Sequence, residues 1–225
     1  MASADKSCGD RKSLKLYHFP ISAPSRGALL AARTIGVPIE VEIVNLFEKE
    51  QLKESFIKVN PQHTVPTLVD NGFVLWESRA IASYLADKYG KDDQFYPKDL
   101  QKRAVVNQRL YFDASNLFVK IRAICFPILF LGETVIKQNL KDDLNNALNF
   151  LETFLNGSKW VAGDNCTIAD TSIYASLSSI LAVGWDISSF PNIQQWVKDC
   201  KALPGFEENQ EGAKQFGEAV KKNLK

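Results

Sequence analysis

Two neighbouring stretches decide the fold of this chain: residues 60–69, Asn-Pro-Gln-His-Thr-Val-Pro-Thr-Leu-Val, and residues 76–81, Trp-Glu-Ser-Arg-Ala-Ile. The Val65-Pro66 bond precedes a short apolar run and is a candidate for the cis form, which only bonds to proline adopt at low cost. The turn residues Asp70-Asn71-Gly72 then predict a hairpin into a second short strand. Ser78 follows that strand and is predicted to begin a helix.

This arrangement suits a small acidic peptide as ligand. A cis bond at Pro66 turns the backbone of Val65 outward, so that its N–H and C=O groups can pair with an extended ligand. Ser78 offers a carboxylate its hydroxyl, the free N–H groups of a helix start and the positive end of the helix dipole. The two stretches therefore predict a site that pairs with a peptide backbone and captures a nearby carboxylate.

From these stretches outward, residues 14–90 alternate short apolar runs with helical patterns. Strands are predicted at 14–19, 39–44, 67–69 and 73–76, and helices at 24–36, 49–59 and 78–89. The order β-α-β-α-β-β-α is that of a thioredoxin-like α/β domain. Residues 91–97 are predicted to be a polar linker, and residues 1–13 a disordered leader.

Residues 98–225 show no strand pattern and are predicted to form an all-helical domain. One long helix is expected within 100–130, with Pro127 as a candidate break, and others around 144–155 and 193–200. The nearly charge-free segment 171–185 is expected to be the buried centre of this domain. Thr167 and Asp170, just before it, have the spacing of a capping box.

Composition excludes several classes of function. The 225 residues carry 27 Lys and Arg against 26 Asp and Glu, a net charge of +1 that favours neither nucleic acid nor an anionic membrane. The longest charge-free run is too short to span a bilayer, and residues 1–12 lack the apolar segment of a secretory signal. Two histidines and four scattered cysteines (Cys8, Cys125, Cys166 and Cys200) predict no metal site, and free thiols suit a reducing cytoplasm.

Three further motifs point to one family: Ser22-Ala23-Pro24-Ser25-Arg26, the run 102–113 and the run 162–170. Together with the opening stretches they resemble the glutathione S-transferases over residues 14–215, specifically the insect delta class, with the epsilon class as neighbour. The resemblance implies conjugation of the glutathione thiolate to hydrophobic electrophiles in detoxification, with no cofactor beyond glutathione itself. It also implies a homodimer, and the same thiolate can support peroxide reduction or dehydrochlorination.

The resemblance assigns catalysis to Ser22, because the matching serine of the delta class donates a hydrogen bond to the glutathione sulfur. A free thiol has a pKa near ~8.5. One hydrogen bond to a charged acceptor, worth about 1.5–3 kcal/mol, lowers that pKa by about one to two units. The alternative is that Ser22 only caps the helix that follows it. Tyr17 and His18 point to opposite faces of a strand and are expected to pack rather than act.

The remaining parts of glutathione are assigned by the same resemblance. His63 is expected at the glycyl end, Val65 at the cysteinyl backbone, and Glu77 with Ser78 at the γ-glutamyl end. The predicted glutathione site consists of Gln51, His63, Thr64, Val65, Pro66, Glu77, Ser78 and Arg79. Gln51 stands where many relatives carry a second histidine, and its amide can still bind a carboxylate. The alternative for Glu77 and Ser78 is an ordinary helix start.

An apolar electrophile pocket is expected between the two domains. Its predicted lining is Ile21, Tyr111, Ser115, Phe118, Val119 and Phe206. Four of these residues share one face of a regular helix after the linker, and plain core packing is the alternative for each. Two other functions stay open. One is a carrier of hydrophobic ligands with the same fold, and the other is a thiol-disulfide exchanger, although Ser22 occupies the place of the cysteine that such an enzyme needs.

Overall fold

The computed structural model describes residues 14–225. The predicted leader and Cys8 lie outside the described residues. A four-stranded sheet of order β2-β1-β3-β4 contains β1 (Leu14–His18), β2 (Glu40–Ile43), β3 (Thr67–Asp70) and β4 (Phe73–Trp76). Strands β1 and β2 are parallel, whereas β3 is antiparallel to both β1 and β4. The predicted thioredoxin-like order of strands and helices is confirmed.

The register of the sheet brings four chain segments to one of its ends. Tyr17 near the end of β1 lies opposite Thr67 at the start of β3, and Thr67 lies opposite Trp76 at the end of β4. Because β2 runs parallel to β1, the end of β2 lies at the same edge. The loops that carry residues 19–22, 44–51, 60–66 and 77–78 therefore all start or finish at this end of the sheet.

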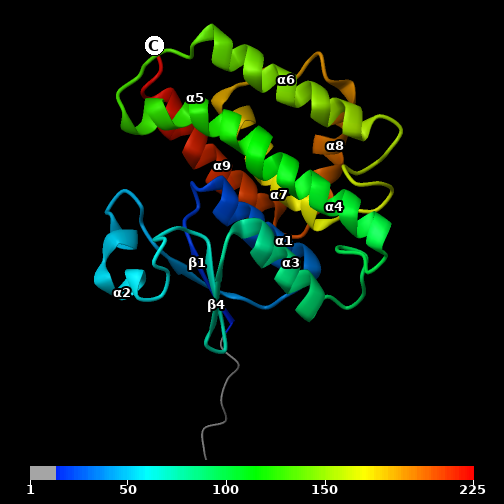
Figure 1. The fold of residues 1–225 in the computed structure, drawn as a ribbon. Coiled ribbons are helices and arrows are strands. Elements are labelled where there is room, and N and C mark those ends of the chain that lie inside the picture. Colours follow the sequence, from blue (N-terminus) through cyan, green and yellow to red (C-terminus); the bar gives the residue numbers. More distant parts are fainter. Residues whose placement is uncertain (1–13) are drawn as a thin grey trace, which may run out of the picture.

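Helices α1 (Ala23–Ile35) and α3 (Ser78–Tyr89) pack against each other beside the sheet, whereas α2 (Glu54–Ile57) lies apart from them (Figure 1). The helix expected at 49–59 is wrong in extent, because only a 3-10 turn (Glu50–Leu52) and the single turn of α2 form. A Glu50 side-chain oxygen accepts from the Asn45 backbone N–H at 2.8 Å, and Lys53 is extended. Such a side-chain bond competes with regular helix and folds this segment as a loop.

From residue 100 onward the described chain consists mainly of helices, which Figure 1 shows gathered on one side of the sheet domain. They are α4 (Leu100–Phe112), α5 (Phe118–Phe130), α6 (Gln138–Leu155), α7 (Ile168–Val183), α8 (Pro191–Asp199) and α9 (Phe206–Lys221). A π-helical turn, Asp113–Leu117, joins α4 to α5. Pro127 lies inside α5 without ending it, and α9 was not expected from the sequence. Within residues 14–225, no helix has the length and apolar character needed to cross a membrane.

Helix α7 is the buried centre of the helical part, as its composition predicts. It packs against α1 of the sheet domain, α4 and α9. Its capping box is present: the Asp170 carboxylate accepts from the Thr167 backbone N–H at 2.8 Å. Asp170 also accepts from the Trp196 indole N–H at 3.0 Å, which joins α7 to α8. Through α1, this packing connects the sheet domain to the helical domain.

Candidate active site

Ser22 is the N-cap of α1, in the turn that leaves β1. Its backbone N–H donates to the Phe19 carbonyl at 2.9 Å, and its Oγ accepts from the Ser25 N–H at 3.4 Å. The hydroxyl proton of Ser22 has no acceptor among residues 14–225. The side chain also lines a cavity. A hydroxyl held in this way can donate its hydrogen bond to an anion in the cavity.

The turn before Ser22 is held by a buried pair, His18 and Ser25. The Ser25 Oγ accepts from the Phe19 backbone N–H at 3.1 Å and lies 2.9 Å from His18 Nδ1. Burial lowers the pKa of His18 to about 4, so its ring is neutral near pH 7. The ring of Tyr17 packs edge-on against Phe56, and neither Tyr17 nor His18 lines the cavity that contains Ser22.

Arg26 holds the same turn by hydrogen bonds from its buried side chain. Its guanidinium is buried and donates to the carbonyls of Pro20 at 2.9 Å and Ile21 at 3.0 Å, the two residues before Ser22. It also donates to the Ala175 carbonyl of α7 at 3.0 Å and to Asn209 of α9 at 3.1 Å. Burial without a carboxylate lowers the pKa of Arg26 to about 9. Sequence analysis left Arg26 out of the site, although its place four residues after Ser22 was a usable signal.

The loop before β3 presents a free backbone at Val65. The Val65-Pro66 bond is cis, as predicted. Asn60, which the sequence analysis did not single out, is buried and donates from its amide to the Thr64 carbonyl at 3.1 Å and to Thr67 Oγ1 at 2.8 Å. Neither the N–H nor the C=O of Val65 is hydrogen-bonded to any part of the chain between residues 14 and 225. Both groups are therefore available to an extended ligand.

The start of α3 presents a second set of predicted residues. Glu77 is exposed and has φ 71°, an uncommon backbone conformation for a residue other than glycine. Ser78 is buried at the first position of the helix. Exposed His63 and Thr64 lie in the neighbouring loop, so the predicted glutathione residues come together at one end of the sheet. The structure thus brings these residues close together, and their contacts with glutathione stay a prediction.

Arg79 is committed to a partner in the helical domain. Its Nε donates to Asp113 Oδ2 at 3.1 Å, and its Nη1 donates to Ser78 Oγ at 3.1 Å. Asp113 lies in the π-helical turn, is fully buried, and also accepts from the Ser172 hydroxyl at 2.6 Å. Its other oxygen, Oδ1, has no partner among the described residues. Arg79 thus positions Ser78, and its guanidinium charge is paired with the carboxylate of Asp113.

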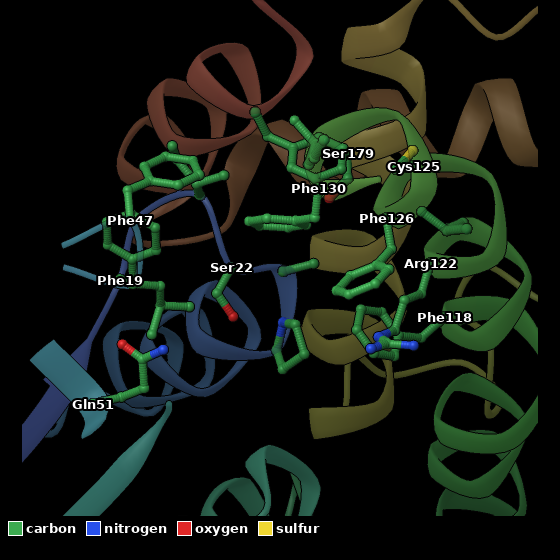
Figure 2. A pocket seen from close by; sticks show the side chains of 17 residues that line it. Phe19, Ser22, Phe47, Gln51, Phe118, Arg122, Cys125, Phe126, Phe130 and Ser179 are labelled. Carbon is green, nitrogen blue, oxygen red and sulfur yellow. The ribbon is translucent and has the colours of Figure 1, made fainter. Parts of the chain in front are cut away.

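An apolar cavity of about 360 Å³ separates the two domains beside Ser22. One wall comes from residues 19–24 and from the loop after β2, and the other comes from α5 (Figure 2). Phe216 of α9 also lines the cavity. Its aromatic lining consists of Phe19, Phe47, Phe118, Phe126, Phe130 and Phe216. Gln51 also lines it, and its buried Oε1 has no hydrogen-bond partner in the described part of the chain.

The cavity contains only part of the predicted electrophile pocket. Ile21 and Phe118 line the cavity, but Tyr111, Ser115, Val119 and Phe206 do not. Tyr111 is 72% and Val119 50% exposed, and the π-helical turn at 113–117 breaks the regular spacing that aligned Tyr111 with Phe118. Phe206 begins α9 and stacks on Tyr174, with ring centroids 5.8 Å apart. Phe216 was missed with its helix. Phe126 and Phe130 follow Phe118 at helical spacing on α5, a signal that the sequence analysis did not use.

The three cysteines that the structure describes are buried thiols. Burial raises the pKa of the Cys125 thiol, which lines the cavity, to about 12. Cys166 and Cys200 are likewise buried free thiols with raised pKa values. Among residues 14–225, no cluster of histidine, cysteine and carboxylate side chains could hold a metal ion.

Comparisons with known proteins agree with this geometry. Residues 16–93 match the family model for the glutathione S-transferase N-terminal domain, and residues 129–210 match that for the C-terminal domain. The chain is 46% identical over 205 residues to glutathione S-transferase D7 of Drosophila melanogaster, covering 90% of this chain and 91% of that protein. The structure of glutathione S-transferase unclassified 2 from Bombyx mori is 79% identical, with 95% and 99% coverage and a TM-score of 0.92. A delta-class glutathione transferase from Nilaparvata lugens is 50% identical, with 93% and 99% coverage and a TM-score of 0.90.

Proposed function

The chain belongs to the glutathione S-transferase family, with relatives in the insect delta class, and on that premise we propose how its own residues carry out glutathione conjugation. The observation that carries the proposal is the free hydroxyl proton of Ser22 at the edge of an apolar cavity. We assign the stabilisation of the glutathione thiolate to this hydroxyl. The thiol proton leaves to water, and the Ser22 O–H then donates to the sulfur anion.

The thiolate forms the new bond to the substrate. Its electron pair makes a sulfur–carbon bond with the electrophilic carbon. In a substitution the leaving halide departs with its own electron pair, and in an addition the neighbouring carbon takes a proton from water. Glutathione, the electrophile and water supply all the atoms and electrons of both reactions, so the proposed chemistry requires no further cofactor.

Glutathione is proposed to lie along the end of the sheet. The free N–H and C=O groups of Val65 suit its cysteinyl backbone, and the start of α3 at Ser78 suits a carboxylate. Exposed Glu77 is assigned to the ammonium group of the γ-glutamyl end. Gln51 and His63 are assigned to the glycyl end, with Thr64 and Pro66 shaping the loop between them.

The electrophile is proposed to occupy the aromatic cavity beside Ser22. A cavity of about 360 Å³ with mainly apolar walls fits a hydrophobic molecule of one or two rings. Detoxification of such compounds is consistent with the family. Because the reaction consumes reduced glutathione, and the described cysteines are free thiols, we place the protein in the reducing cytoplasm.

A homodimer is proposed through the outer face of α4. Leu100 is 81% and Tyr111 72% exposed on this helix, which is unusual for large apolar side chains. The run 102–111 is the candidate dimer strip that the sequence offers, but within it Arg103 pairs with Asp87 of the same chain. Light scattering should give twice the mass of one chain, and Tyr111→Asp should shift the mass toward the monomer. A wild-type mass of one chain would refute the proposed dimer.

The proposed catalysis is tested by conjugation to a chromogenic aryl halide between about pH 5.5 and about pH 9, across the titration of a free thiol. Ser22→Ala should lower kcat/KM roughly 10- to 100-fold and raise the apparent pKa of the rate profile. Ser115→Ala, which removes an exposed hydroxyl outside the cavity, is the matched control. A wild-type protein that binds glutathione and apolar ligands without turnover would instead be a carrier. An unchanged pH profile in Ser22→Ala would move thiol activation to another group.

A further inference from the structure

Arg122 is the single charged residue in the lining of the aromatic cavity. It extends from α5, together with Phe118 and Phe126, on the wall that faces Ser22 (Figure 2). Most of the lining side chains around it are apolar. Arg122 itself is exposed, so its guanidinium lies at the solvent-open edge of the cavity, where it can meet a charged group that hydrophobic binding alone does not use.

Arg122 also differs from the other arginines of the described chain. Arg26, Arg33, Arg79, Arg103 and Arg109 each donate at least one hydrogen bond to a carbonyl or a side chain. Among residues 14–225, Arg122 is the one arginine that donates no hydrogen bond and forms no ion pair. Its five N–H donors are thus free for a group that enters the cavity.

The ring of Phe126 holds the Arg122 guanidinium in place. The central carbon of the guanidinium lies over this ring, 4.3 Å from its centroid. Stacking on an aromatic face leaves the in-plane N–H groups at the edge of the guanidinium exposed. Two parallel N–H groups at such an edge match the two oxygens of a carboxylate.

We propose that the preferred electrophiles are apolar, ring-containing molecules that carry a carboxylate away from the reacting carbon, and that Arg122 binds this carboxylate. The proposal rests on the proposed function and names the substrate class of the same site. Ser22 and Arg122 come from opposite walls, so a substrate that reaches both places its reacting carbon at the sulfur and its acid group at α5 (Figure 2).

Electrostatics gives Arg122 a larger effect on an acid than on a neutral substrate. Bound glutathione in the reactive state brings two carboxylates and a thiolate against one ammonium group, which leaves a net negative charge. A carboxylate substrate is repelled by that charge unless a cation balances it. Arg122 supplies this cation at the exposed edge of the cavity, whereas a neutral ester has no comparable need for it.

The test compares an aryl α,β-unsaturated ketone that bears a ring carboxylate with the methyl ester of the same compound. Steady-state rates are measured at saturating glutathione for the wild type, Arg122→Gln and Arg122→Lys. The ratio of kcat/KM for the acid to that for the ester should fall about tenfold in Arg122→Gln, chiefly through the KM for the acid. Arg122→Lys should give an intermediate ratio, because lysine keeps the charge but not the two-pronged geometry.

Lys120→Gln is the matched control, because it removes the same charge from the same helix at a residue outside the cavity lining. It should leave the acid-to-ester ratio within about twofold. An equal acid-to-ester ratio in wild type and Arg122→Gln would overturn the proposal. Turnover of the ester in the same experiment would still support the proposed function. A raised KM for glutathione with an unchanged ratio would also overturn it, by placing Arg122 on glutathione. Turnover of neither compound by a wild type that conjugates the chromogenic aryl halide would overturn this inference and leave the proposed function standing.

Discussion

Arg26 on α1 and Asn209 on α9 are 183 positions apart in the chain, yet Arg26 Nε donates to Asn209 Oδ1 at 3.1 Å. The Asn209 amide in turn donates to Ser178 of α7 at 3.1 Å. Because Arg26 also holds the carbonyls of Pro20 and Ile21, the turn that carries Ser22 is attached to the last helix of the protein. The geometry of the thiolate site therefore depends on helices far from it in sequence.

Arg26→Lys should damage both stability and catalysis. Lysine cannot reach the carbonyls of Pro20 and Ile21, α7 and Asn209 at once, so buried acceptors lose their donors. We expect the free energy of unfolding to fall by roughly 2–4 kcal/mol in urea titrations and kcat to fall about tenfold. Arg33→Lys is the control, because the Arg33–Glu208 pair also joins α1 to α9 but is exposed. Equal effects of the two substitutions would contradict the role given to Arg26.

Asp113→Asn should weaken glutathione binding from the other domain. The substitution removes the charge that holds Arg79, and Arg79 in turn contacts the Ser78 hydroxyl. The KM for glutathione should rise several-fold, and stability should fall by about 3 kcal/mol, because Asp113 is fully buried. Asp87→Asn breaks the exposed pair with Arg103 and should cost less than about 1 kcal/mol. An unchanged KM in Asp113→Asn would show that Arg79 does not support the carboxylate site.

Gly212→Ala tests the close approach of α9 to the active-site turn. An alanine Cβ at this position would clash with the Pro20 carbonyl oxygen and would lie 2.6 Å from Arg26 Cδ. In an ordinary helix interior, glycine to alanine gains about 1 kcal/mol. Here we expect a loss of both stability and kcat, read from thermal unfolding and steady-state rates. Glu211→Ala, on the exposed face beside it, should leave both nearly unchanged, and a stabilised, fully active Gly212→Ala would refute the close contact.

His18→Asn should remove part of the acid sensitivity of the fold. The folded pKa of His18 is about 4, below the unfolded value of 6.5, so between these values only the unfolded chain binds the proton. Wild-type stability therefore loses about 3 kcal/mol from this group as the pH falls from 6.5 to 4. Asparagine keeps an acceptor for Ser25 without this titration.

The measurement for His18 is the difference between urea unfolding free energies of wild type and His18→Asn at several pH values. Burial raises the pKa of Asp170 to about 6. Protonation of Asp170 therefore stabilises the folded state as the pH falls below 6, which opposes the effect of His18. Asp170 is present in both proteins, so the difference isolates His18. A difference that stays constant from pH 6.5 to 4 would contradict a neutral buried imidazole.

The sheet domain was the more predictable part. Its strands, hairpin turn and helix ends depend on local signals, such as Asn71-Gly72 and the left-handed Gly36 that ends α1. The cis bond at Pro66 and the capping box of α7 are equally local and were predicted. The segment Lys49–Val59 was the exception, because the Asn45 backbone N–H donates a hydrogen bond to the Glu50 side chain and the segment does not form a regular helix.

The helical domain was less predictable where packing overrides the pattern. Helix α9 buries Asn209, Gly212, Ala213 and Gly217, and such small or polar residues give little hydrophobic signal. The lack of a side chain at Gly212 and Gly217 allows α9 to approach Pro20 and Ala182 closely. Likewise, the π-helical turn before α5 leaves no clear trace in hydrophobic spacing, yet it decides which residues of α5 line the cavity.

By itself, the sequence determined the family, the order of strands and helices, and the position of Ser22 at the start of α1, because each depends on residues close together in the chain. Only the tertiary structure decided which side chains meet. It attached the Ser22 turn to α9 through Arg26, committed Arg79 to Asp113, and left Arg122 unpaired in an aromatic cavity. These relationships join segments that lie tens to hundreds of residues apart, and close packing at the domain boundary determines them.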